Sequence, residues 1–292
     1  MGYFLKQWGH FLVDGIGRFW PLSDKKFDSY KVVFLKDKFS KIDGSYLEFL
    51  NYLTISKDRL IDVQVPTQFD EVLIPSLSYD TIGNFSPEHI RMINFIVENA
   101  HIEDISVPDK VYLTRTKFAR HKEVGEKDIE AFFAANGYTV FSPEKLPVRN
   151  QIALFRKSAE IVCVNGTIPL NVLFARPELK LTVLNKTSIK HTALLRACNF
   201  TGVEPVYIDV YYEPFKKFPE NIGIGPFWIS ITDNLIRYMS DSHMKFNINV
   251  MTLRIKHMFN WMMYAKNIIK YYLRKTCLRR YVRYIKSIFK KE

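Results

Sequence analysis

Short apolar runs alternate with longer segments in which apolar residues recur every three or four positions, and this alternation fills the middle of the chain. Strand-like runs begin at Lys110, Tyr138, Glu160, Leu179 and Val206. Helix-like segments lie between them, at residues 126–137, 146–159, 169–175 and 188–198. Repeated strand and helix units predict a parallel sheet of the Rossmann type, because a crossover helix is the usual link between parallel strands.

The first hundred residues follow the same rhythm less regularly. Residues 31–35, 59–63 and 71–75 are predicted to form short strands. A helix is predicted to begin at Ser86-Pro87, because serine is a favoured N-cap and proline suits the first turn. These patterns predict an N-terminal domain at 1–107, a second domain at 108–212, helices at 213–253 and a tail at 254–292.

Composition indicates a globular chain in a reducing compartment. The chain has 292 residues, of which 47% are hydrophobic, enough for two domains. Its three cysteines are scattered and form no C-x-x-C pair, which argues against a disulfide framework and a zinc site. Charged residues such as Lys6 and Asp14 interrupt the N-terminus, and no apolar stretch of about 18 residues occurs. Neither a secretory signal nor a spanning helix is therefore expected.

The net charge of +12 is concentrated in the tail. Residues 254–292 carry 12 Lys and Arg but one acidic residue, which leaves 30 basic against 29 acidic residues elsewhere. From Leu278 onward, apolar positions form one helical stripe with basic residues largely opposite. This pattern is typical of a helix that lies on an anionic membrane surface, and residues 254–292 are expected to make that contact. The alternatives are a helix packed on its own domain, or a nucleic-acid-binding tail on a nearly neutral body.

The strand that begins at Glu160 ends at Asn165-Gly166-Thr167, where a ligand could bind. Ligands collect at the carboxyl ends of parallel strands, where helix N-termini present free N–H groups. Gly166 would let the backbone approach a phosphate, and Thr167 could cap the next helix. The alternative is a plain strand-to-helix turn.

A diphosphate bound here would take its neutralising charge from the protein. The chain contains no Asp-x-Asp pair, so the usual carboxylate clamp for a metal-bound diphosphate is missing. Arg115 lies at the predicted end of a strand, and Lys117 and Arg120 follow closely. Guanidinium and ammonium groups form charge-assisted hydrogen bonds with phosphate, although these residues could also lie in a solvated loop.

His10 and Asp14 are four residues apart and would share one face of a helix. A histidine with a carboxylate partner can act as a general base, which is worth about 10²–10⁴-fold in rate. Asp24 is the reserve candidate for this role. The alternative is that His10 has only a structural hydrogen bond.

Several short motifs occur in a fixed order along the chain. They are Gly9-His10-Phe11-Leu12-Val13-Asp14, Thr114-Arg115, Arg120-His121, Glu126, Pro143-Glu144, Asn150-Gln151-Ile152, and Asn165-Gly166-Thr167 followed by Asn171. In this order the set resembles the signature region of glycosyltransferase family 61. Asn165 stands where the family usually has histidine.

The resemblance implies a GT-B architecture, with two Rossmann-like domains facing across a cleft and a nucleotide sugar held by the second. It implies an inverting hexosyl- or pentosyltransferase. Because the Asp-x-Asp pair is missing, we expect it to need no metal or other cofactor, and His10, Asp14 or Asp24 is expected in the catalytic role. The residues it implies for donor binding are Arg115, Lys117, Arg120, Glu144, Gln151, Asn165, Gly166, Thr167 and Asn171.

The resemblance further implies a glycan or lipid-linked acceptor in the synthesis of a surface polysaccharide such as capsule or lipopolysaccharide. The expected location is the cytoplasm, on the inner face of the cell membrane, with no nucleic-acid partner. A non-catalytic scaffold of the same fold is the alternative that the Asn165 substitution favours.

Overall fold

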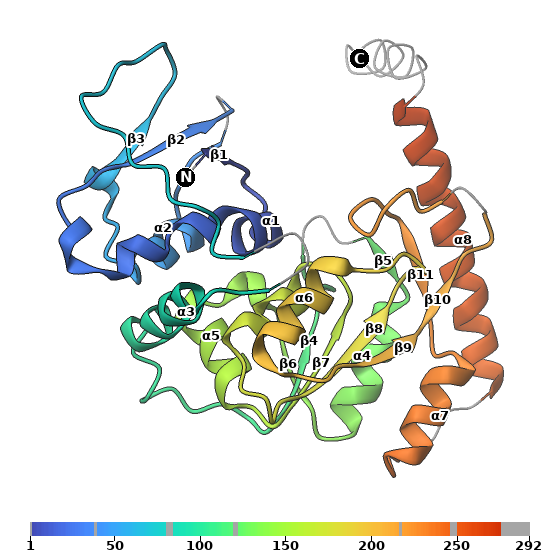
Figure 1. The fold of residues 1–292 in the computed structure, drawn as a ribbon. Helices are drawn as coiled ribbons and strands as arrows, with labels where there is room; N and C mark the ends of the chain where they lie inside the picture. The colour runs from blue at the N-terminus through green and yellow to red at the C-terminus, as the bar shows by residue number, and fades with distance from the viewer. Residues whose placement is uncertain are drawn as a thin grey trace, which may run out of the picture. The chain divides into compact units, whose positions relative to one another are not determined.

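The computed structural model describes residues 2–37, 40–79, 84–118, 122–215, 218–245 and 250–275 (Figure 1). The chain forms two compact units. Unit 1 comprises Met1–Thr114, Gly137–Leu184 and Lys190–Tyr207, and unit 2 comprises Arg115–Asn136, Asn185–Ile189 and Ile208–Glu292. The domain boundaries expected at residues 107 and 212 stay a prediction.

The main sheet has five strands in the order β6-β4-β7-β8-β9. Strand β4 pairs in parallel with β6 and with β7, and β7 pairs in parallel with β8. The predicted parallel sheet is therefore confirmed. The strands are β4 (Lys110–Leu113), β6 (Thr139–Phe141), β7 (Glu160–Val164), β8 (Lys180–Asn185) and β9 (Val206–Asp209).

The segments between these strands are helical, with two differences from the prediction. Residues 169–175 were expected to form an α-helix, but η7 (Ile168–Phe174) is a 3-10 helix whose seven residues are all buried. Helix α6 (Thr192–Thr201) begins later than Ser188, because the Ser188 amide and hydroxyl donate to the Glu213 carboxylate at 2.9 and 2.8 Å instead. The other elements of this region are β5 (Glu123–Val124), α4 (Glu126–Ala135), η6 (Pro143–Lys145) and α5 (Val148–Lys157).

The N-terminal part of unit 1 contains a smaller parallel sheet in the order β1-β2-β3. Its strands are β1 (Gly2–Phe4), β2 (Val32–Lys36) and β3 (Leu60–Asp62), accompanied by helices α2 (Ser45–Asn51) and α3 (Pro87–Asn99). As predicted, Ser86 caps α3 by accepting a hydrogen bond from the His89 amide. The strand expected at residues 71–75 is wrong, because this segment forms no strand and exposes 79% of Ile74.

One hydrophobic core joins the two sheets within unit 1. Phe11 and Phe49 from the N-terminal part belong to the same buried cluster as Val111, Ile161 and Val183 of the main sheet. The first two rings lie edge to face with centroids 5.2 Å apart, a favourable geometry for aromatic pairs. The short helical turns that carry Phe11 are thereby held against the main sheet.

Those turns run from residue 8 to residue 27 and change helix type repeatedly. They are α1 (Trp8–His10), the π-helix η1 (Phe11–Gly15) and the 3-10 helices η2 (Ile16–Arg18), η3 (Trp20–Ser23) and η4 (Lys25–Phe27), with a further 3-10 turn η5 (Lys57–Arg59) before β3. Short 3-10 and π segments of this kind are uncommon in the middle of ordinary helices and often lie near functional sites.

Unit 2 contains a three-stranded sheet in the order β10-β11-β5. Strand β11 (Phe227–Ile229) pairs in parallel with β5 and antiparallel with β10 (Tyr211–Tyr212). Within the region 213–253, where helices were predicted, the chain instead forms a strand followed by α7 (Asp233–Asp241), because all three residues of β11 are buried between two partner strands. Helix α8 (Val250–Lys275) places Tyr264 in the buried cluster around Trp228.

Candidate active site

The carboxyl ends of β4, β7 and β8 lie in register at one edge of the main sheet. Leu113 of β4 pairs with Cys163 of β7, and Val164 pairs with Leu184 of β8. Each strand is followed within two residues by a polar residue, namely Arg115, Asn165 or Lys186. Binding sites of parallel α/β proteins form at this edge.

Arg115 is held from its backbone and from its side chain by residues of unit 2. Its amide donates to Glu126 Oε1 at 2.9 Å, and its Nε lies 3.4 Å from Glu123 Oε2. The guanidinium carbon lies 4.9 Å from the centre of the Phe118 ring. Among the described residues, the terminal guanidinium nitrogens donate to no protein group, so they can serve a ligand.

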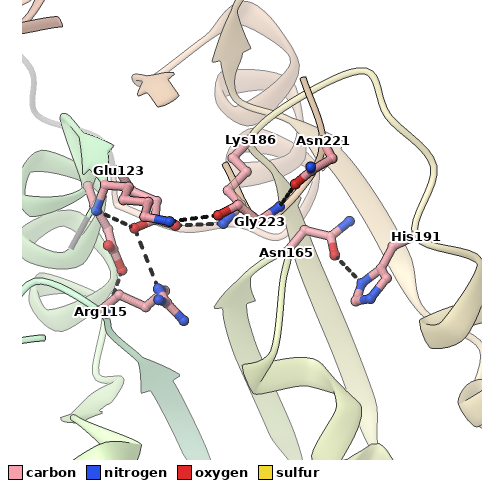
Figure 2. A network of polar contacts seen from close by, with 9 residues as sticks. Arg115, Glu123, Asn165, Lys186, His191, Asn221 and Gly223 are labelled. Carbon is pink, nitrogen blue, oxygen red and sulfur yellow. Dashed lines mark hydrogen bonds and ion pairs between the residues drawn. The ribbon is translucent and has the colours of Figure 1, made fainter. Parts of the chain in front are cut away.

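Glu123 and Lys186 form a buried ion pair beside Arg115 (Figure 2). Lys186 Nζ lies 2.6 Å from Glu123 Oε1, and the two side chains are 4% and 1% exposed. Burial acts to raise the pKa of Glu123, but Lys186 and then Arg115 outweigh it and hold the pKa at about 2. Burial lowers the pKa of Lys186, and Glu123 opposes that shift. We interpret the cluster as a charged pair, because the low pKa of Glu123 requires a cation beside it.

Neither Glu123 nor Lys186 was predicted as a site residue. From the sequence, Glu123 is a single charged residue before the helix predicted at 126–137, and Lys186 is a single charged residue after a predicted strand. Such positions usually indicate a solvated surface. The signal that could have drawn attention to Lys186 is its position directly after the Leu179–Asn185 run.

The side chain of Asn165 contacts His191, a residue that was not predicted to belong to the site. The Asn165 amide donates to Leu184 O at 2.8 Å, which extends the pairing of β7 and β8 by one residue. Its side-chain Oδ1 lies 2.8 Å from Nδ1 of His191, the residue that precedes α6 (Figure 2). Since Oδ1 can only accept, Nδ1 carries the hydrogen. A histidine thus lies next to the position where the family usually has one.

Gly166 and Thr167 make the turn after Asn165. Gly166 has φ of +146°, a conformation that favours glycine. The side chain of Thr167 forms no capping hydrogen bond, so the expected capping role is wrong. The reason is that Thr167 itself has helical dihedrals, φ −73° and ψ −34°, whereas a capping side chain belongs to a residue with extended backbone.

Asn171 is engaged within the protein at both ends of its amide. Its Oδ1 accepts from Trp8 Nε1 at 3.2 Å, and its Nδ2 donates to Ile168 O at 3.1 Å. The side chain is buried. These bonds connect the first helix of the chain to η7. Because both ends of its amide are engaged, we do not assign Asn171 to ligand binding.

The helix that carries His10 packs directly on the junction after β7. A Cβ atom added to Gly9 would lie 3.0 Å from Leu170 Cδ1 and 3.4 Å from Thr167 Oγ1. Two predicted parts of the site, about 160 residues apart in the sequence, are thus neighbours in unit 1. His10 itself forms the expected pair with Asp14, with Nδ1 and Oδ2 2.6 Å apart and both side chains largely exposed.

Asp24 lines a cavity of about 380 Å³ within unit 1. Trp20 and Phe27 contribute aromatic rings to its wall, and Glu88 contributes a carboxylate. A hydrogen bond from the Lys26 side chain is the main cause that holds the pKa of Asp24 below its ordinary value. A carboxylate with a lowered pKa accepts hydrogen bonds well but is a weaker base.

The remaining predicted donor residues occupy different environments. Lys117 and Glu144 are exposed. Gln151 is buried, and its amide donates to Leu146 O at 3.2 Å. Arg120 lies outside the described residues. In the described ranges, no three His, Cys, Asp or Glu side chains are grouped as a metal site would require.

A parallel α/β sheet with a fixed arginine and a glycine junction at its carboxyl edge is typical of proteins that bind phosphorylated ligands. The Glycosyltransferase 61 family matches the chain over residues 8–183, more than half of its 292 residues. The chain belongs to this family, and membership indicates the transfer of a sugar from a donor to an acceptor. Comparison with curated proteins gives no match.

Proposed function

We propose that the chain is a metal-independent, inverting glycosyltransferase of GT-B architecture that uses a nucleotide-sugar donor and transfers a hexosyl or pentosyl group. The observation that carries the proposal is Arg115, whose guanidinium is paired with Glu123 at 3.4 Å while its terminal nitrogens donate to no described group. This arrangement suits the diphosphate leaving group, because a preorganised cation stabilises charge that develops in the transition state.

The proposed reaction is a direct displacement at the anomeric carbon. An acceptor hydroxyl oxygen attacks this carbon and transfers its proton to the His10 imidazole, while the bond to the donor phosphate oxygen breaks. The electron pair leaves with the diphosphate. Asp14 accepts from His10 Nδ1, so Nε2 is the nitrogen that takes the proton, and the carboxylate stabilises the resulting imidazolium.

We assign the acceptor to the cavity that Trp20 and Asp24 line. The face of a pyranose ring is apolar and packs on an indole, and its hydroxyls donate to carboxylates. The cavity's ionic groups are paired, Asp24 with Lys26 and Glu88 with Arg91, which favours an uncharged sugar over an anion.

The acceptor class that we propose is a glycan or lipid-linked saccharide of a surface polysaccharide, capsule or lipopolysaccharide, and the proposed location is the cytoplasmic face of the membrane. The family indicates sugar transfer but neither acceptor nor location. The amphipathic stripe predicted after Leu278 lies outside the described residues, so this part rests on the sequence pattern.

The test is the affinity for uridine diphosphate and related nucleoside diphosphates, measured by calorimetry on folded protein. Arg115→Ala should weaken binding about ten- to a hundred-fold, the loss expected for a hydrogen bond to a charged group. Arg237→Ala, which removes an exposed arginine of α7, is the matched control and should bind as wild type. Unchanged affinity in a folded Arg115→Ala protein would refute the assigned site.

The second candidate function is a non-catalytic scaffold of the same fold, which the asparagine at position 165 favours. A scaffold would bind nucleoside diphosphate without releasing it from a nucleotide sugar. Measuring release of the diphosphate from radiolabelled donors, with and without acceptor extract, separates the two functions.

A further inference from the structure

Helix α8 exposes a large apolar surface on the sides that do not pack against the rest of unit 2. Tyr264 and Ile268 are 1% and 7% exposed and face the core. On other sides of the helix, Met251 is 72% exposed and Ile269 is 61% exposed. Isolated exposed apolar residues are common, but a contiguous patch of this kind marks an interaction site.

The exposed residues repeat with helical spacing. Met251, Ile255, Met258, Met262 and Ile269 follow one another at intervals of four, three, four and seven, which places them in one stripe. Phe259, Trp261 and Met263 are also about half exposed and widen the stripe on both sides. The apolar surface is therefore wider than the narrow seam that a two-helix coiled coil needs.

The charges on α8 are all of one sign. Among residues 250–275 there are six Lys and Arg and no Asp or Glu. Two of the six form ion pairs, Lys256 with Asp128 and Lys275 with Glu220. In the part of the chain that the structure describes, Arg254, Lys266, Lys270 and Arg274 have no acidic partner, and helical spacing places Arg254 and Lys266 at the two edges of the apolar stripe.

We infer that α8 docks flat on a bilayer that contains anionic phospholipid, with the stripe from Met251 to Ile269 entering the headgroup region. A wide apolar face flanked by lysine and arginine is typical of helices that lie in a membrane interface, and the long basic side chains can reach the headgroups from its edges. A second copy of the chain fits less well, because two adjacent α8 helices would bring together positive charges without a single acidic residue.

This surface differs from a transmembrane segment. It overlaps the first part of the tail predicted at 254–292, but it does not include the stripe predicted from Leu278 onward. None of the helices in the described ranges has the length and apolar content that a membrane span requires. The docking surface on α8 precedes Leu278, so it can be altered while that stripe remains. The inference is also independent of sugar transfer, since no residue of the candidate active site lies on α8.

The experiment measures co-sedimentation of the full-length protein with vesicles of phosphatidylcholine alone or mixed with phosphatidylglycerol. The test variant is Ile255→Gln/Met258→Gln/Met262→Gln, because glutamine keeps helix propensity. The matched control is Val65→Gln/Val72→Gln/Ile74→Gln, which removes three apolar side chains of unit 1 that are at least as exposed as those of the test variant. We expect the test variant to bind anionic vesicles at least about ten-fold less tightly, and the control to bind as wild type.

Two further measurements make the outcome decisive. Brominated lipid should quench fluorescence of the wild-type protein but not of Trp261→Phe, and high salt should weaken binding because it screens the flanking charges. Circular dichroism and nucleoside diphosphate binding check that each variant is folded. Equal vesicle binding by wild type and the test variant would refute the inference, as would a wild-type dimer that ignores vesicles and that the test variant converts to monomer.

Discussion

Replacing Glu123 with glutamine tests the buried charge cluster that holds Arg115. The substitution keeps the shape of the side chain but leaves Lys186, which is 4% exposed, as a buried cation without its carboxylate. Breaking a buried ion pair in this way costs about 3–5 kcal/mol. We therefore expect Glu123→Gln to lower the free energy of unfolding by about this amount at neutral pH.

The pH dependence of stability gives a second measure of the same ion pair. The pKa of Glu123 is about 2, against an ordinary value of 4.5, and each unit of difference corresponds to about 1.4 kcal/mol. The wild-type protein thus has about 3 kcal/mol of stability from this group above pH 4.5. That contribution is lost as the pH falls from 4.5 toward 2, because the unfolded chain takes up the proton first.

The assay is urea unfolding followed by tryptophan fluorescence at a series of pH values from neutral to acidic. Glu123→Gln should lack the part of the acid destabilisation that wild type shows below pH 4.5. Glu88→Gln, which removes a partly exposed carboxylate paired with Arg91, is the control and should change stability little because water screens the pair. The double variant Glu123→Gln/Lys186→Met should recover much of the lost stability, and it keeps the test possible if the single variant does not fold. If Glu123→Gln matches wild type in both stability and acid profile, the buried pair does not exist.

Three more predictions concern catalysis, backbone geometry and metal dependence. His10→Ala should lower turnover by about 10²–10⁴-fold while the donor dissociation constant stays at its wild-type value; unchanged turnover in steady-state assays would transfer the role of base to Asp24. Gly125→Ala should abolish folding, seen as loss of the transition in thermal melts, because at φ +100° the new Cβ would lie 2.0 Å from the Ile229 carbonyl oxygen. The control is Gly137→Ala, at φ +83° with no atom within 4 Å of the new Cβ. It should lower the free energy of unfolding by only about 1–2 kcal/mol. An equal loss in both glycine variants would contradict this reasoning. Excess chelator should leave nucleoside diphosphate binding and sugar transfer unchanged, and an activity loss that manganese restores would show that a metal takes part.

Local pattern predicted the elements of the main sheet well. The runs that begin at Lys110, Glu160 and Leu179 are strands of one parallel sheet, because apolar period, β-branched residues and turn residues are properties of a few neighbouring positions. The pairing of His10 with Asp14 could also be predicted, since a four-residue spacing in a helix brings two side chains together.

Where the local pattern was misleading, the presence or absence of neighbouring strands decided whether a segment forms a strand. Residues 71–75 and residues 227–229 are both short apolar runs, but only the second lies between two partner strands. A strand needs hydrogen-bond partners from elsewhere in the chain, and no local period shows whether they exist.

The chemistry of the site depended on contacts between distant residues. Glu123 and Lys186 are 63 positions apart, and in a sequence each reads as an ordinary surface charge. Gly9 packs against Leu170, and Asn165 contacts His191. No sequence motif predicted either contact. The sequence alone therefore determined the α/β class, the glycosyltransferase family and the candidate residues at the strand ends. Only the tertiary structure decided which charges are buried, which histidine stands beside Asn165 and which face of α8 stays exposed, because burial and electrostatic partners are set by packing between segments far apart in the chain.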